Sequence, residues 1–192
     1  DVLFRREVLE RTEGYDEILV GGEDPELSQR VRKSKESPNQ IHQLDVEMTN
    51  HDMSMFRVRQ YWKRGYRTGY GFAAVLDRHP ETCDGFWKTE YRRILVRGGV
   101  APILFLAGLI GGLFWWPIWI VCALGLGLVF FPRLLRGDYF AKSKNLELHE
   151  AKKYAWHCSL VVIPECFGVV RYWVGKFFRK PLRNKRAKRS DT

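Results

Sequence analysis

Hydrophobic residues are spread unevenly along this chain, and the longest apolar stretch lies near its middle. No charged residue occurs between Arg97 and Arg133. One straight helix over that run would measure about 50 Å, well beyond the ~30 Å hydrocarbon core of a bilayer. Trp115-Trp116-Pro117 interrupts the run halfway, where tryptophan favours a membrane interface and proline breaks a helix. The pattern predicts a hairpin of two short membrane helices, at roughly residues 98–115 and 117–132.

Basic residues flank the predicted hairpin on both sides, which bears on its orientation. They are Arg92, Arg93 and Arg97 before it and Arg133, Arg136, Lys142 and Lys144 after it. Because cytoplasmic loops carry an excess of lysine and arginine, both ends of the hairpin are expected in the cytoplasm. One long tilted or kinked span, or a buried helix pair in a soluble protein, remain open as alternatives. The apolar run begins only near residue 98, so we do not expect it to be a signal peptide.

A second, weaker apolar segment covers residues 156–170. Pro164 and Glu165 interrupt it, and its apolar core is short for a membrane span. We expect an interfacial helix held at the headgroups by the basic residues that follow it, and a third full span is the alternative. The terminal basic run, residues 176–189, is expected either to contact anionic lipid headgroups or to be a solvated tail without a partner.

The remaining sequence before the hairpin has the pattern of a soluble α/β domain. Residues 43–48 alternate polar and apolar side chains, which predicts a half-buried strand, and residues 53–70 interleave aromatic with basic side chains. The chain is basic, with 32 Lys+Arg against 22 Asp+Glu. The neighbouring membrane-like sequence favours lipid headgroups over nucleic acid as its anionic partner. Four cysteines without metal-binding spacing are expected to be free thiols in a reducing compartment.

The most distinctive short motif is Gly21-Gly22-Glu23-Asp24, which precedes an amphipathic segment. The two glycines permit a tight turn and leave room for a bulky substrate to approach. We expect Asp24 to cap the following helix and Pro25 to be its first residue, with Leu27 and Val31 on one helical face. A carboxylate at such a turn is also where a general base for an acceptor hydroxyl would lie. Capping and proton transfer both remain open for Asp24.

Residues 4–32, with the pattern Gly21-Gly22-Glu23-Asp24-x-x-Leu27-x-x-Arg30, resemble the inverting family 2 glycosyltransferases of the GT-A type. The resemblance implies a partial α/β, Rossmann-like catalytic domain with a hexosyltransferase-like activity. It implies that Asp24 takes the proton from the acceptor hydroxyl, with Glu23 beside it, while the acceptor attacks a nucleotide-activated sugar. Gly21 and Gly22 are then expected near the acceptor and the diphosphate.

A stretch further along the chain is similar to the family's aromatic and arginine-rich helix. Gln60-Tyr61-Trp62-Lys63-Arg64 holds the residues of the family's Gln-x-x-Arg-Trp element in a different order. The resemblance implies that Gln60, Trp62 and Arg64 lie near the diphosphate and acceptor. The changed order favours transfer of one or a few sugars over processive synthesis of a polymer. His51 is expected either to help bind a divalent metal, Mg or Mn, or to be structural.

The family's Asp-x-Asp element, which holds the metal and the nucleotide diphosphate, is not found before the motif. The nearest string, Asp45-Val46-Glu47, follows it instead. We therefore expect the C-terminal portion of a longer enzyme. Residues 1–90 would end its catalytic domain, residues 91–135 would form the membrane hairpin, and residues 136–192 would form the interfacial helix and a basic cytoplasmic tail.

Two hypotheses of function follow from these patterns. The first is the acceptor-side half of an integral membrane glycosyltransferase, which transfers a sugar from a nucleotide-activated donor to a glycan or lipid-linked acceptor and is inactive on its own. The second is a non-enzymatic membrane-surface protein that binds anionic lipid or a partner through basic amphipathic helices.

Overall fold

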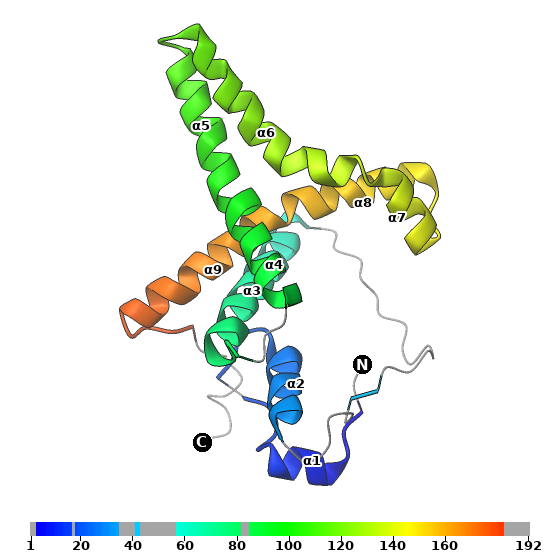
Figure 1. Ribbon diagram of the computed structural model, residues 1–192. Helices are drawn as coiled ribbons and strands as arrows, with labels where there is room; N and C mark the ends of the chain where they lie inside the picture. Colours follow the sequence, from blue (N-terminus) through cyan, green and yellow to red (C-terminus); the bar gives the residue numbers. More distant parts are fainter. Residues whose placement is uncertain (1–2, 17, 35–40, 43–56, 82–84, 183–192) are drawn as a thin grey trace.

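The computed structural model describes residues 3–16, 18–34, 41–42, 57–81 and 85–182, and its ordered elements are helices (Figure 1). No β-strand occurs within these ranges, so the expected α/β, Rossmann-like fold is wrong for the described part of the chain. Within these ranges the helices bury their apolar faces directly against one another, with glycines at the closest contacts. The predicted strand at residues 43–48 lies outside the described residues.

From α4 onward the helices follow one another with short connections. Their bounds are α1 Arg6–Arg11, α2 Glu23–Lys33, α3 Val58–Arg78, α4 Gly85–Leu95, α5 Ala101–Gly112, α6 Trp119–Leu134, α7 Gly137–Lys144, α8 Leu148–Leu160 and α9 Val162–Phe177. A π-helical turn, Val96–Val100, joins α4 to α5 without a break, and a 3₁₀ turn, Trp116–Ile118, precedes α6. The expected boundary between residues 90 and 91 therefore falls inside α4.

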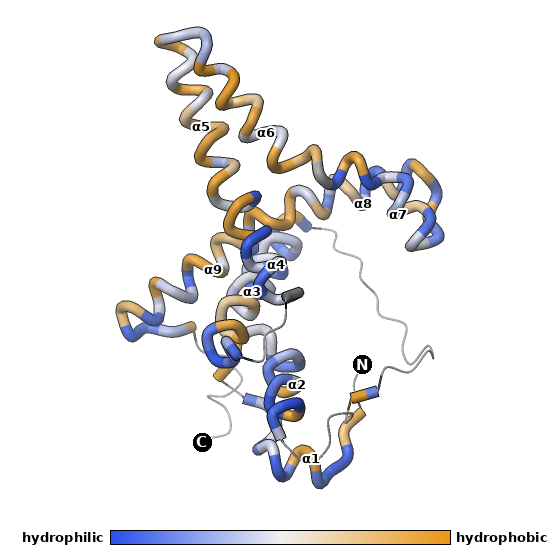
Figure 2. Tube along the Cα trace, viewed as in Figure 1, coloured by the Kyte–Doolittle hydropathy of each residue, from blue (hydrophilic) through white to orange (hydrophobic). Residues whose placement is uncertain are grey.

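Helices α5 and α6 form an apolar hairpin that projects from the rest of the molecule (Figures 1 and 2). Its two arms pack backbone to backbone, because a Cβ atom on Gly108 would lie only 2.1 Å from the Cys122 nitrogen. Most of its large apolar side chains face outward, and Phe114 near the tip is 86% exposed. The expected pair of helices is thus present, with the turn at residues 113–118.

Two helices of the described chain are long and apolar enough to cross a membrane, by length and composition. They are Trp87–Gly112, which joins α4 to α5, and Leu148–Phe177, which joins α8 to α9. The apolar part of α6, Trp116–Phe131, is shorter. The segment expected to be a short interfacial helix therefore belongs to a helix of 30 residues.

Arg97 closes the foot of the hairpin and is buried there. Its guanidinium group donates to the Leu128 carbonyl oxygen through Nε at 3.1 Å and to the Val129 carbonyl oxygen through Nη2. Pro132 has no N–H, so the Leu128 carbonyl lacks the donor that it would have in a regular helix. Arg97 therefore supplies, from the α4–α5 rod, the hydrogen bond that proline removes from α6.

Helices α3 and α9 run side by side in the same direction. A Cβ atom on Gly69 would lie 1.8 Å from the Glu165 carbonyl oxygen, and one on Gly168 would lie 2.0 Å from that of Tyr66. Ala73, Ile94 and Val169 form the small buried cluster where α3, α4 and α9 meet. Because the two backbones touch without intervening side chains, α3 and α9 form one rigid unit.

Candidate acceptor-side site at the glycine turn

The glycine turn sits at the start of α2. Gly22 has φ +85° and precedes the helix as its N-cap residue, and α2 begins at Glu23. The Gly22 carbonyl accepts the first helical hydrogen bond, from the Glu26 N–H at 2.9 Å. The expectation that Asp24 caps the helix and Pro25 is its first residue is therefore wrong. Glycine takes the capping position because the left-handed conformation there is strained for other residues.

Both glycines are pressed against α3. A Cβ atom on Gly21 would lie 2.7 Å from the Arg67 carbonyl oxygen, and one on Gly22 would lie 3.0 Å from the Gly71 Cα. The Arg67 Nε also donates to the Val20 carbonyl oxygen at 2.8 Å, which fastens the turn to the helix. The room that we expected for a substrate beside these glycines is filled by α3 on this side. Their absent side chains instead allow the turn to rest directly on a helix backbone.

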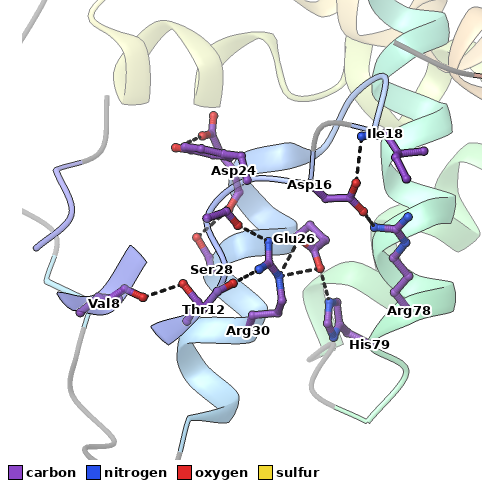
Figure 3. A network of polar contacts seen from close by, with 12 residues as sticks. Val8, Thr12, Asp16, Ile18, Asp24, Glu26, Ser28, Arg30, Arg78 and His79 are labelled. Carbon is purple, nitrogen blue, oxygen red and sulfur yellow. Dashed lines mark hydrogen bonds and ion pairs between the residues drawn. The ribbon is translucent and has the colours of Figure 1, made fainter. Parts of the chain in front are cut away.

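Asp24 lies in the first turn of α2, with its carboxylate exposed. The Tyr15 hydroxyl donates to Asp24 Oδ1 at 2.9 Å, so one carboxylate oxygen of this exposed residue is held in place. Figure 3 shows Asp24 in the first turn of α2, away from the Glu26 network. Partial burial, the hydrogen bond to Asp24 and the nearby Glu23 charge raise the pKa of Tyr15. Tyr15 therefore stays a hydrogen-bond donor, because it carries its proton well above neutral pH.

Glu26, two residues further on, has a structural environment. It is buried and accepts hydrogen bonds from Arg30, whose Nη2 lies 2.8 Å from Glu26 Oε2, while the His79 Nε2 lies 2.9 Å from Glu26 Oε1 (Figure 3). Arg30 also donates to the carbonyl oxygens of Thr12 and Gly14. This network ties the loop before the glycine turn to α2 and to the end of α3.

The sequence analysis did not identify this network, although the spacing of Glu26 and Arg30 indicated one of its contacts. Glu26 and Arg30 stand at the i, i+4 spacing that favours an ion pair on a helix. His79 had no such signal, because its partner lies 53 residues away in the sequence. A further tie of the same kind joins Asp16 to Arg78, and Asp16 Oδ1 accepts a hydrogen bond from the Ile18 N–H at 2.9 Å.

The other expected site residues lie along the first half of α3. The Gln60 side chain accepts a hydrogen bond from the Arg57 N–H at 3.2 Å and so closes the first helical turn. Trp62 packs against Phe167 of α9, with ring centroids 5.6 Å apart. Arg64 is exposed, about 4.5 Å along the axis before Arg67. The structure thus places Arg64 closest along α3 to the glycine turn, and it turns Trp62 toward α9.

His51 lies outside the described residues. Within the described ranges, no group of three or more histidine, cysteine, aspartate or glutamate side chains is placed to hold a metal ion. Glu23 and Asp24 alone do not make such a ligand set. Comparisons with family models, with curated proteins and with solved structures find no match to this chain. The interpretation of the site therefore rests on its geometry and on the resemblance of its motif.

Acid is expected to destabilise the network beneath the glycine turn. Burial alone would raise the pKa of Glu26, but the hydrogen bonds from Arg30 and His79 outweigh it and hold the pKa below its ordinary value of 4.5. The same balance, through Arg78, lowers the pKa of Asp16 from 3.8. Since both folded-state pKa values are depressed, their stabilisation is complete above pH 4.5 and is lost as the pH falls through the folded-state values.

Thermal unfolding in detergent between pH 3 and pH 7 tests this expectation. The Glu26→Gln variant should lose about 3 kcal/mol at pH 7, because it removes the buried carboxylate that pairs with Arg30 and bonds to His79, and its melting temperature should depend less on acid. Glu10→Gln is the matched control, since Glu10 forms an exposed pair with Arg6. Equal acid dependence in the parent and in Glu26→Gln would contradict the assignment.

Proposed function

We propose that this chain is the acceptor-side half of a membrane-bound, inverting glycosyltransferase. The observation that carries the proposal is the contrast between two carboxylates in one helical turn. Glu26 is buried in an ion pair with Arg30 and a hydrogen bond with His79, whereas Asp24 is exposed beside a turn anchored to α3, with one oxygen bonded to the Tyr15 hydroxyl. A general base needs this combination of a fixed position and an accessible oxygen.

In the proposed reaction, the second carboxylate oxygen of Asp24 accepts the proton of the acceptor hydroxyl. The acceptor oxygen forms a bond to the anomeric carbon of the donor sugar as the bond from that carbon to the nucleoside diphosphate breaks. The electron pair of the broken bond leaves with the diphosphate, and a single displacement of this kind inverts the anomeric carbon. Tyr15 donates to the other Asp24 oxygen and keeps the carboxylate oriented toward the acceptor.

A divalent metal, Mg or Mn, is expected to stabilise the leaving diphosphate in the complete enzyme. The described residues do not supply its ligands, so the metal and the nucleotide are assigned to sequence outside this chain or to its undescribed residues. Arg64 and Arg67 are exposed on the helix that supports the glycine turn, and we propose that their guanidinium groups contact the diphosphate.

We propose that the α5–α6 hairpin anchors the chain in the membrane. Its outward side chains are apolar around both arms, and Trp116 at the turn is 78% exposed. An apolar surface that covers both arms of the hairpin is unfavourable in water, whereas contact with lipid acyl chains is favourable. The positive-inside tendency then assigns the glycine turn and the C-terminal tail to the cytoplasmic side.

The proposal that the nucleotide site is incomplete in this chain can be tested by titration with nucleotide sugars and manganese. The purified chain of 192 residues should show only weak binding that disappears at physiological salt, because charge without a positioned metal gives no specific site. The protein encoded by the full-length gene should bind one nucleotide sugar saturably. Saturable micromolar binding by the 192-residue chain alone would contradict this proposal.

A further inference from the structure

The 30-residue helix Leu148–Phe177 is long enough to span a bilayer, yet its second half is joined along its length to α3. We propose that α9 lies in the plane of an anionic leaflet, with its outer apolar face against the acyl chains, and does not cross the membrane. The inference rests on the membrane location of the α5–α6 hairpin proposed above. It does not depend on sugar transfer.

The first step is that α9 cannot move without α3. The contacts of Gly69 and Gly168 leave no space for even a methyl group between the two backbones. Asp77 near the end of α3 accepts hydrogen bonds from the Tyr172 hydroxyl at 2.6 Å and from Lys176 Nζ at 2.7 Å. Burial alone would raise the pKa of Asp77, but these bonds outweigh it and keep the pKa below its ordinary value, so the Asp77 carboxylate is ionised at neutral pH. The two helices therefore take the same position relative to the membrane, because one cannot enter the bilayer without the other.

The second step is that α3 does not fit inside a bilayer. It exposes basic side chains in its first half and at its end, namely Arg59, Lys63, Arg64, Arg67 and Arg78, the last of which pairs with Asp16. Lysine and arginine side chains inside the hydrocarbon of a bilayer are costly. A spanning α9 would carry α3 and these cations into the membrane with it. A helix bound to α3 is thus kept out of a transmembrane position.

The third step concerns the face of α9 opposite α3, which is apolar. It exposes Val170, Trp173, Val174 and Phe177, at the three- and four-residue spacing of one helical stripe. Phe167 lies at the edge of this stripe, where its exposed ring also packs against Trp62 of α3. Arg179 and Lys180 follow this stripe and are exposed, and Lys176 lies 5.2 Å from the Trp173 ring centre. An apolar stripe with tryptophan and adjoining cations fits the boundary between acyl chains and anionic headgroups.

The fourth step is the place of α9 relative to the hairpin. A Cβ atom on Gly98 would lie 2.0 Å from the Val162 carbonyl oxygen, so α9 begins against the foot of the α4–α5 rod. Figure 1 shows α9 crossing at this foot while the hairpin projects away from it. If the hairpin enters a membrane, α9 lies where the membrane surface must be. The lipid surface is then continuous from the hairpin to the outer face of α9.

Nitroxide depth measurements in vesicles containing phosphatidylglycerol test this proposal. Single cysteines replace Phe167, Val170, Val174 and Phe177 on α9, Thr68 on the exposed face of α3, and Ile103 on the hairpin. The native cysteines are replaced in all variants, and helix content is checked against the parent. We expect the four α9 labels at similar shallow depths, about 5–10 Å below the headgroups, with Thr68 in water and Ile103 in hydrocarbon.

The outcomes separate the possible failures. A spanning α9 would give depths that change by about 15 Å from residue 167 to residue 177, and this would overturn the inference while leaving the hairpin in place. Labels on α9 that stay in water, with Ile103 immersed, would also overturn it and indicate a protein partner on this face. If Ile103 is not immersed, the membrane location itself fails.

A separate experiment tests whether Arg179 and Lys180 bind anionic headgroups. Arg179→Gln combined with Lys180→Gln should reduce immersion of the Val174 label in phosphatidylglycerol vesicles and have little effect in phosphatidylcholine vesicles. Arg32→Gln with Lys33→Gln, at the exposed end of α2, is the matched control and should change neither. Equal immersion in both lipids for all variants would overturn the role of the cations.

Discussion

Replacing Asp24 with asparagine is expected to lower sugar transfer by the full-length enzyme by about two to four orders of magnitude, the usual contribution of a general base. Stability should change little, because Gly22 caps the helix and the asparagine oxygen can still accept the Tyr15 hydrogen bond. The loss of a negative charge from the first turn of α2 costs about 0.5 kcal/mol. The rate is measured under saturating donor, and folding by thermal unfolding.

Two variants control this result. Asp138→Asn makes the same change in the first turn of α7 and should leave transfer unchanged. Glu23→Gln removes the neighbouring carboxylate and should reduce transfer less than Asp24→Asn does. Near-normal transfer by Asp24→Asn would show that this carboxylate only orients Tyr15 and the start of α2.

Replacing Arg97 with leucine is expected to cost about 3 kcal/mol of hairpin stability, because two carbonyl groups in an apolar surrounding lose a charged donor. The loss should depend on Pro132. With Pro132→Ala, the alanine N–H can bond to the Leu128 carbonyl, and the same Arg97→Leu change should cost markedly less. Thermal unfolding of the four proteins in detergent gives the coupling between the two residues.

Arg136→Leu removes an exposed arginine beyond the same helix and is the control for loss of charge alone. It should change the melting temperature little. An equal cost of Arg97→Leu with and without Pro132 would contradict the assignment of Arg97 to the carbonyl that proline leaves without a donor.

The hairpin could be predicted from sequence because its signal is local. A charge-free run and a central Trp-Trp-Pro string are visible without any knowledge of tertiary contacts, and the structure has helices on either side of that string. The exact turn was less predictable. Expected at residues 115–117, it spans residues 113–118, since α5 already ends at Gly112.

The glycine contacts could not be predicted because each depends on a partner far along the chain. Gly69 meets Glu165, and Gly21 meets Arg67, but nothing in the local sequence distinguishes these glycines from those in flexible turns. The same reason explains the error at the start of α2. Aspartate and glycine both suit an N-cap, and the contact of Gly22 with α3 decided between them.

The error in fold class has a different origin. The expectation of an α/β domain came from the resemblance of the motif and from alternation at residues 43–48, whereas every described segment of regular structure is helical. The candidate base itself needed only local information, since the exposed Asp24 follows directly from the glycine turn. Its anchor, Tyr15, lies nine residues earlier and was not identified as a partner.

The anomeric configuration of the first product tests the central claim most directly. The full-length protein is incubated with a panel of nucleotide sugars, Mg or Mn, and membrane extract as the source of acceptor, and the anomeric configuration of the new glycosidic bond is determined by NMR. A single carboxylate that accepts the acceptor proton predicts transfer with inversion at the anomeric carbon. Transfer with retention, or no transfer from any nucleotide sugar, would contradict the account.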